Sequence, residues 1–525
     1  MTTAPEIKLK RFLHFGRETP FYQPVDHLVK SFPQNCLTSV EELIADEKAT
    51  DAVIHIVKAF SDGYSAHPQY LVYALAWCAR QKTSLPLREA AYNAFKTICK
   101  SPQNMFLFIK FAKELSAPNS GWGHGWRRVV NDWYLNQEPL QLAECATRYR
   151  SMYLWSHKDI LKLAHPATED VAKQAVLKYI VFGLKEAQQE FGDKAAAQPV
   201  LQYLQTVEEF KHCKNEEQAA RMLEQHHFSL EHVPQHLLKS KEVWTALVPC
   251  LPLDVLLKNL KRLARLRFLR GNHVVVARVL DALENQTALE ESNVHPAQVL
   301  IALRNYELSG KLKYTPPDPS KEVKQLPQPN PKVIEALNTL LESSFKLLVS
   351  TGMRYMIVVD TRPQMLTSRC WQCQVQPLQA AALLSLCLVK AERDVMVMAF
   401  GFGTPAPVAL EKSMSFKQAQ DKLKEVPSTT MDLAAPIEWA EKTKKSVDVF
   451  IIVTDNHLRG IKVKPIDALK QYRTSLNIPN AKLVVCALSV PEFFVASPED
   501  PGMLDVAGFD GQVPRIIEAF SRGAF

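Results

Sequence analysis

The apolar positions of this chain follow two different periods, and the first one is helical. From about Thr50 to about Leu308, apolar residues recur every three or four positions, the spacing of helices that bury one face. Clear cases are YLVYALAWCARQ at 70–81, LREAAYNAFKTICK at 87–100 and VLIALRNYEL from Val299. The turns between are short and carry Pro, Ser or Asn, so successive helix pairs are expected. This pattern favours an α-solenoid of the HEAT kind, with a compact helical bundle as the alternative.

The period changes after a proline-rich segment. Six prolines lie between Tyr314 and Val333 in a polar context, which is typical of a linker or an extended surface loop. Beyond it, short β-branched runs alternate with helical stretches, as in buried parallel strands crossed by helices. The runs are MIVVD (356–360), VMVMAF (395–400), VFIIVTD (449–455) and KLVVCAL (482–488).

Composition indicates a globular protein of two or three domains. Of the 525 residues, 47% are hydrophobic and 22% charged, and the net charge of +8 permits an anionic partner without demanding one. Only Cys370 and Cys373 form a C-x-x-C pair, so no zinc site is expected. The start has no secretory apolar region, and the most apolar run, 380–389, is too short to span a bilayer. We therefore expect a reduced, intracellular protein with free thiols and no membrane association.

Basic and aromatic side chains interleave between Gly121 and His165. The cations are Arg127, Arg128, Arg148, Arg150, Lys158 and Lys162, and the rings are Trp122, Trp126, Trp133, Tyr149, Tyr153 and Trp155. Such a mixture suits a phosphate backbone with unstacked bases better than a small metabolite. The alternative is an ordinary solvated face over a Trp-rich core.

Within this segment, a helix is predicted to begin after Ser156. Ser156 and Asp159 have the S-x-x-D form of a helix start, with the serine as cap. Lys158, Lys162 and His165 then follow at i, i+4 and i+7 and share one face. His157 and Asp159 also invite an acid–base role, but no nucleophile elbow, P-loop or H-E-x-x-H motif accompanies them. The protein is therefore not expected to be an enzyme.

A second basic element follows at LLKNLKRLARLRFLR. Lys258, Arg262 and Arg265 fall at i, i+4 and i+7, with no acidic residue between Val255 and Leu280. This helix is either a further strip of phosphate contacts or a solvated face.

Several motifs, in order along nearly the whole chain, resemble the family of the sixty-kilodalton Ro autoantigen, the SS-A/Ro ribonucleoprotein. They are KRFLHFG, WSHKDILKLAH, LKSKEVWTAL, LPLDVLLKNL, HPAQVLIAL, VFIIVTDN and GMLDVAGFD. The resemblance implies an α-helical, HEAT-like solenoid closed into a ring (the TROVE module), followed by an α/β von Willebrand factor A-like, Rossmann-type domain. It places the ring at 8–312, a Pro-rich linker at 313–333 and the A-like domain at 334–525.

The resemblance also implies a function in RNA quality control. Members bind small Y-type noncoding RNAs on the outside of the ring and the single-stranded 3′ ends of misfolded noncoding RNAs in its hole. A monomeric protein of a small cytoplasmic ribonucleoprotein is therefore expected, present also in the nucleus, without a DNA partner, and with room for protein partners on the A-like domain. The alternative is a protein-interaction scaffold that uses the solenoid and the A-like domain without RNA.

The family's RNA contacts carry over unevenly. Arg148 stands where the family has a lysine and keeps its charge, whereas Met152 replaces an arginine. His165 corresponds to the family's key histidine and Lys162 to a basic position. The predicted RNA-binding residues are Arg127, Arg128, Arg148, Arg150, Trp155, His157, Lys158, Lys162, His165, Lys258, Arg262 and Arg265.

The resemblance further implies a metal-ion-dependent adhesion site, which this sequence has in a degenerate form. The family pattern is D-x-S-x-S after the first strand, a threonine on a second loop and an aspartate after a later strand. Arg362 and Gln364 replace the two serines and Met431 the threonine, which leaves Asp360 and Asp455. A hard cation such as Mg²⁺ needs a near-octahedral set of oxygens, so neither a metal nor another cofactor is expected. The hypothesis is that Arg362 replaces the ion and bridges both aspartates; Ser428, Thr429 or Thr430 could restore a ligand if the loop register shifts.

Overall fold

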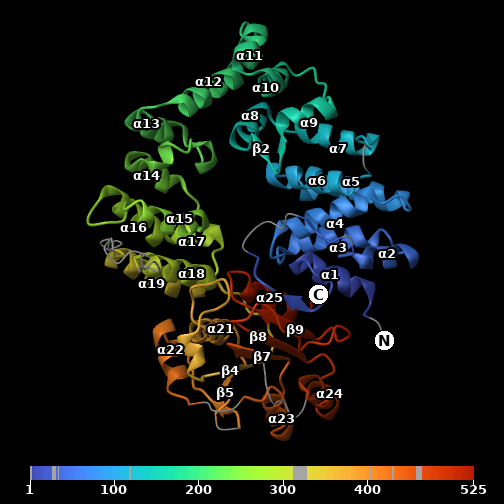
Figure 1. The fold of residues 1–525 in the computed structure, drawn as a ribbon, viewed down its shortest axis with the longest axis vertical. Helices are drawn as coiled ribbons and strands as arrows, with labels where there is room; N and C mark the ends of the chain where they lie inside the picture. The colour runs from blue at the N-terminus through green and yellow to red at the C-terminus, as the bar shows by residue number, and fades with distance from the viewer. Residues whose placement is uncertain are drawn as a thin grey trace, which may run out of the picture. The chain divides into compact units, whose positions relative to one another are not determined.

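The structure is a computed structural model that describes residues 3–25, 31–33, 35–117, 120–310, 328–401, 404–427, 431–456 and 464–525 (Figure 1). The chain forms two compact units. Unit 1 comprises Met1–Arg11, Arg17–Lys30 and Pro252–Phe525, and unit 2 comprises Phe12–Gly16 and Ser31–Leu251. Most of the predicted linker at 313–333 lies outside the described residues.

Unit 2 is helical, as the apolar period predicts. Its helices are α2 (Thr38–Ala45), α3 (Asp51–Asp62), α4 (Pro68–Arg80), α5 (Leu85–Ile98), α6 (Pro102–Glu114), α7 (His124–Leu135), α8 (Pro139–Arg148), α9 (His157–Ala164), α10 (Val171–Phe182), α11 (Leu184–Phe191), α12 (Gln198–His212), α13 (Glu216–His226) and α14 (Lys241–Leu247). Side-chain oxygens of Ser84, Ser101 and Asp170 cap the starts of α5, α6 and α10. Helices near in sequence pack on one another, as α4 does on α5 and α6, or α10 on α11 and α12. This is the local packing of a helical repeat array.

Unit 1 continues the helical pattern before it becomes α/β. Its helices are α15 (Leu253–Arg265), α16 (Val274–Glu284), α17 (Gln286–Ser292), α18 (Pro296–Glu307) and α19 (Pro331–Ser344), while α1 (Pro5–Phe15) begins in this unit and ends in unit 2. α15 packs on α18, and α19 packs on α16 and α18. α18 also contacts α21 of the A-like part, so these last repeats share a unit with the sheet.

A seven-stranded sheet follows, in the order β1-β9-β8-β7-β4-β5-β6. Every neighbouring pair is parallel except β5 with β6. The strands are β1 (Phe21–Tyr22), β4 (Tyr355–Val359), β5 (Val395–Ala399), β6 (Ala406–Pro407), β7 (Val449–Thr454), β8 (Lys482–Ala487) and β9 (Met503–Ala507). The helices between and after them are α20 (Gln364–Thr367), α21 (Pro377–Ala391), α22 (Phe416–Lys424), α23 (Ala435–Lys442), α24 (Pro465–Ser475) and α25 (Val513–Ser521). All four predicted strands are present.

The sheet core explains why these strands read as continuous apolar runs. All five residues of β4 and all six of β7 are buried. Val358 and Ile452 belong to a buried cluster with Leu433, just before α23, and Leu469, on α24. Neighbouring positions such as Ile357 and Ile451 alternate to the other face. Helices therefore cover both faces, as expected for a parallel sheet.

The edge strand β1 comes from the N-terminal segment. Phe21 and Tyr22 pair in parallel with Asp505 and Val506 of β9. The Arg11 guanidinium donates to the carbonyl oxygens of Pro498 (3.0 Å) and Asp500 (3.2 Å), which ties the same segment to the sheet domain. The compact units do not follow the predicted domain limits at residues 8 and 334, because unit 1 contains residues on both sides of each limit. The predicted limits describe segments of the family and stay a prediction. No helix among the described residues is long and apolar enough to cross a membrane.

Candidate functional site

Helix α9 presents two exposed lysines on one face, and no ion pair of either one is found within the described ranges. Ser156 caps the helix by accepting from the Asp159 backbone N–H, and the Asp159 carboxylate accepts in return from the Ser156 N–H, a capping box. Ile160, Leu161 and Ala164 are buried, whereas Lys158 and Lys162 are exposed. The predicted helix start and the orientation of its faces are confirmed.

His165 lies beside this face rather than on it. The helix ends at Ala164, and His165 follows as its C-cap in the left-handed conformation (φ 53°), with its N–H donating to the Leu161 carbonyl. The imidazole is exposed at the end of α9. It can therefore contact the same ligand as Lys162, although the helical i+7 position that we predicted for it does not exist.

The structure corrects the prediction for His157, which is a core residue. Its side chain is 2% exposed, its Nδ1 is joined by a 2.7 Å hydrogen bond to the Tyr134 hydroxyl, and its ring packs edge-on to Phe106. Burial lowers the pKa of His157 to about 3, so the ring is neutral. A neutral, buried imidazole offers neither charge nor surface to RNA or to acid–base chemistry.

Three of the tryptophans also belong to the core. Trp122 stacks on Trp126 with ring centroids 4.5 Å apart, and the Trp133 indole N–H donates to the Cys99 carbonyl. All three are buried, so the Trp-rich core alternative is correct for them. Trp155 is only half-buried, with its ring centroid 6.0 Å from that of Trp122, so it lies at the edge between this core and the basic surface.

A strained hairpin that we did not predict from the sequence precedes α9. Strands β2 (Ser151–Met152) and β3 (Trp155–Ser156) pair antiparallel around a two-residue turn. Both turn residues have positive φ, 53° at Tyr153 and 68° at Leu154, a geometry normally supplied by Asn-Gly. Leu154 is fully exposed at 104%. Bulky residues held in this conformation with an apolar tip in solvent are typical of functional sites.

Arg148 already has an internal partner. Its Nε donates to Glu231 Oε2 at 2.9 Å, and its guanidinium lies 5.0 Å from the Tyr149 ring centroid. It lines a surface groove of about 720 Å³ that Lys100, Gln103 and Tyr149 share. Arg148 is therefore a partly neutralised cation beside a polar groove, which the sequence could not reveal because Glu231 is far away in the chain.

The remaining predicted cations of unit 2 are exposed. Arg127 and Arg128 lie on α7, which the Asn131 amide ties to α9 by donating to the Ala164 carbonyl at 3.0 Å. Within the part of the chain that the structure describes, no ion pair involves any member of the set Arg127, Arg128, Arg150, Lys158 and Lys162. We call this set together with Arg148, Tyr153, Leu154, Trp155 and His165 the α7–α9 surface.

The second basic strip lies in unit 1, on α15. Lys258, Arg262 and Arg265 are exposed, opposite the buried leucines of this helix. Lys258 pairs with Asp254 at 3.0 Å, the acid that directly precedes the acid-free stretch. The strip therefore carries less unbalanced charge than its sequence suggests.

The A-like part carries a second candidate site where β4 and β7 end. These two strands are neighbours, and the strand order reverses between them, which is where doubly wound sheets bind ligands. Asp360 follows β4 and Asp455 follows β7, and both are buried, Asp360 completely. Burial and the Asp360 charge raise the pKa of Asp455, and Arg362 only partly offsets them.

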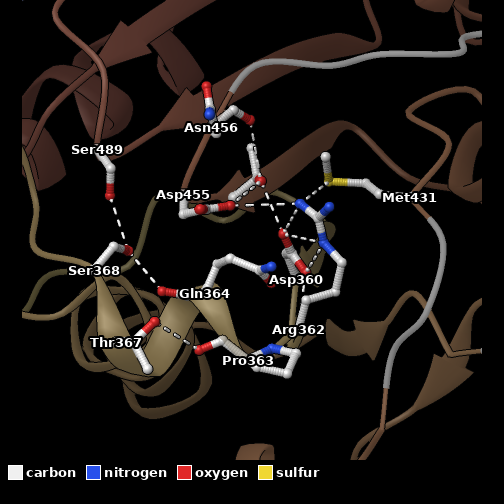
Figure 2. Close-up of polar contacts among 11 residues, drawn as sticks. Asp360, Arg362, Pro363, Gln364, Thr367, Ser368, Met431, Asp455, Asn456 and Ser489 are labelled. Atoms are coloured by element: carbon white, nitrogen blue, oxygen red, sulfur yellow. Dashed lines mark hydrogen bonds and ion pairs between the residues drawn. The ribbon is translucent and has the colours of Figure 1, made fainter.

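Arg362 fills the space between these carboxylates (Figure 2). Its Nη2 lies 2.7 Å from Asp360 Oδ2 and 3.4 Å from Asp455 Oδ1, as the sequence hypothesis required. The third ligand position holds the Met431 thioether, whose sulfur is 4.0 Å from Nη2. Ser428, Thr429 and Thr430 lie outside the described residues. In the described part of the chain, no cluster of three or more His, Cys, Asp or Glu side chains could hold a metal ion, and the residues present do not fit Mg²⁺.

Comparison with known proteins assigns both parts of the chain to a family. Residues 32–339 match the TROVE domain, more than half of the chain, and residues 354–521 match the Ro60 vWA domain. The chain belongs to the Ro60 family. The family assignment confirms the resemblance and the fold, a helical repeat region followed by an A-like domain.

Ro60 relatives from distant organisms align with this chain almost from end to end. "RNA-binding protein RO60" of Caenorhabditis elegans is 26% identical, covering 99% of this chain and 88% of the relative. The Deinococcus radiodurans protein of the same name is 29% identical, covering 99% and 93%. The crystal structure of the Deinococcus radiodurans RO (RSR) protein superposes with a TM-score of 0.84 at 27% identity and covers 99% of this chain and all of that one. Closure of the helices into a ring stays a prediction.

Proposed function

We propose that this Ro60-family protein binds RNA through the α7–α9 surface. The observation that carries the proposal is a group of exposed cations, Arg150, Lys158 and Lys162 among them, next to half-buried aromatic rings; none of these three forms an ion pair with a residue that the structure describes. Lysine and arginine that are not neutralised within the protein are available to phosphates, whose counterions they release on binding. The TROVE match and the printed names of the relatives support the same ligand.

The hairpin adds contacts that phosphate binding alone does not need. Tyr153, Leu154 and Trp155 lie between Arg150 and Lys158 in the sequence, and the Leu154 side chain is fully exposed. Aromatic and apolar side chains stack on unpaired bases, and double-stranded RNA keeps its bases inside. The surface is therefore suited to structured RNA with unpaired bases at a loop, bulge or end.

The finer proposal is that the ligands are small Y-type noncoding RNAs and the single-stranded 3′ ends of misfolded noncoding RNAs. It rests on the family resemblance, with Arg262 and Arg265 on α15 as additional phosphate contacts. We propose a monomeric, non-enzymatic component of a ribonucleoprotein in the cytoplasm and also in the nucleus, with neither DNA nor a metal cofactor. The rival function is a protein scaffold, for which the exposed cations of the α7–α9 surface have no evident use.

The test is binding of a structured RNA with a single-stranded 3′ tail at about 50 and about 200 mM salt. The test variant is Arg150→Ala/Lys158→Ala/Lys162→Ala, and the matched control is Lys417→Ala/Lys422→Ala/Lys424→Ala, which removes the same charge from α22. We expect the test variant to lose about 100-fold in affinity at low salt, with a salt slope smaller by about two to three units. The control should bind like the wild type. Equal weakening of both variants would mean that only net charge matters, and no binding by the wild type would favour the scaffold.

A further inference from the structure

Two buried carboxylates meet at the carboxyl ends of β4 and β7, and a pair like this stays fully ionised only beside a cation. Asp360 is 0% and Asp455 7% exposed, on neighbouring strands. Two ionised carboxylates so deep in a protein repel each other and lose their hydration, so each is stable only with compensating charge or donors. The source of that compensation is independent of whether the protein binds RNA.

Donors from the protein itself surround Asp360. Oδ1 accepts from the Arg362 backbone N–H (3.0 Å) and from its Nε (3.0 Å). Oδ2 accepts from Arg362 Nη2 (2.7 Å) and from the Thr454 hydroxyl (2.9 Å). The fork of Arg362 therefore grips both oxygens of one carboxylate and reaches the other at 3.4 Å (Figure 2). A metal ion placed between Asp360 and Asp455 would have to displace the guanidinium from Oδ2.

The other side chains that the structure describes around Arg362 do not form an oxygen cage for a hard cation either. Gln364 stands on the short helix α20, and Met431 places a thioether against the guanidinium, where Mg²⁺ would need oxygen. We propose that the Arg362 guanidinium is the resident cation of this crevice, so that the A-like domain joins Asp360 and Asp455 without binding a divalent metal. The positive charge is built into the chain and is always present, whereas a metal site depends on the concentration of free ion.

The opposite end of the same two strands offers a matched control. Arg354, just before β4, makes a bidentate pair with Asp448, just before β7, at 2.9 Å from Nε and 2.7 Å from Nη2. There a single carboxylate faces the arginine, and both side chains are more exposed than in the crevice. Loss of Arg354 should therefore lower the unfolding temperature of the domain without creating a binding place for a cation.

The experiment compares thermal unfolding of the full chain in EDTA and in about 10 mM MgCl₂, together with Mn²⁺ binding by electron paramagnetic resonance. The variants are Arg362→Ser, Arg362→Lys, the triple Arg362→Ser/Gln364→Ser/Met431→Thr, and the control Arg354→Ser. We expect the wild type to melt at the same temperature in both buffers and to leave Mn²⁺ free. Arg362→Ser should melt lower in EDTA and recover by several degrees in MgCl₂, because the ion takes the vacated place.

The triple variant should bind Mn²⁺ at least about tenfold more tightly than Arg362→Ser, since it adds two hydroxyl ligands. Arg362→Lys should melt between Arg362→Ser and the wild type in EDTA, since it keeps the charge but loses the fork, and Arg354→Ser should be indifferent to MgCl₂. Mn²⁺ binding by the wild type that Asp360→Asn abolishes would overturn the proposal, as would an Arg362→Ser variant equally unstable in both buffers. If Arg362→Ser does not fold in either buffer, the Mn²⁺ measurement on the wild type decides.

Discussion

The α7–α9 surface and the crevice at Asp360 use cationic side chains in opposite ways. On α9, Lys158 and Lys162 extend into solvent, and no described acid pairs with them. In the crevice, Arg362 is held by two carboxylates, one of them completely buried. The side chains are cationic in both regions, but only those of the α7–α9 surface can still pair with the anionic groups of another molecule. A basic residue in a sequence is thus evidence for an anionic ligand only when its internal partners are known.

Arg148 stands between these extremes. It pairs with Glu231, but both side chains are about one-third exposed. An exposed pair contributes about 1 kcal/mol or less, so a phosphate can compete for this arginine, whereas it cannot for Arg362.

The largest expected effect is on stability, and it separates the two kinds of arginine. Arg362→Ala should reduce the free energy of unfolding by about 3–5 kcal/mol, because it leaves buried carboxylates without a cation. Arg148→Ala should cost about 1 kcal/mol or less. Urea unfolding of both variants measures the difference, and equal losses would contradict the comparison.

A third buried carboxylate shows what happens in this sheet without an arginine. Asp505 in β9 accepts from the backbone N–H groups of Val495 (2.7 Å) and Ala496 (2.9 Å), and no ion pair involves it among the residues described. Burial raises the pKa of Asp505 to about 7, with these two hydrogen bonds opposing the rise. The native state keeps this proton while the unfolded chain releases it near pH 4. The stability that Asp505 contributes is therefore complete below about pH 4 and is lost as the pH rises through about 7.

Asp505→Asn should remove this loss. The amide stays neutral and can still accept from Val495 and Ala496, so the variant should gain stability over the wild type between pH 4 and pH 7, by a few kcal/mol at most. Chemical unfolding at several pH values measures the gain. A difference that does not change with pH would show that Asp505 is ionised in the native protein.

The hairpin of the α7–α9 surface should show a conflict between stability and binding. Replacing Tyr153 and Leu154 by Asn-Gly supplies the residues that this turn prefers, so the free energy of unfolding should rise by about 1–2 kcal/mol. RNA affinity should fall, because the stacking side chains are lost. A gain in stability with unchanged affinity would limit the surface to phosphate contacts.

The smallest expected effect concerns Glu231. Glu231→Gln removes the charge that competes with phosphate for Arg148, so RNA affinity should rise about two- to fivefold at low salt. Glu209→Gln, on the neighbouring helix α12, is the control for the loss of one negative charge. An unchanged affinity would show that Arg148 is not a contact.

The sequence predicts what depends on local pattern. The helical period of 70–81, the four strand runs, the Ser156 cap and the place of Arg362 after a buried strand are all as expected, because each depends on neighbours in the chain. The sequence does not distinguish His157 from its exposed neighbour Lys158, because the contacts that bury it come from Tyr134 and Phe106 on other helices. The Arg148–Glu231 pair, the hairpin turn without glycine and strand β1 all depend on residues or constraints far away in sequence.

Strand β1 also constrains how the protein is made. Phe21 and Tyr22 leave the ribosome long before their partner β9, which follows more than 400 residues later in the chain. Unit 2, which comprises Phe12–Gly16 and Ser31–Leu251, can fold in the meantime, because all of it precedes Pro252 in the chain. The sheet domain, by contrast, can close its edge only after β9 has been synthesised, and pairing across so long a stretch of chain is slow. A nascent chain stalled before Met503 would therefore expose an unpaired strand edge at β8, where another chain could add and start aggregation.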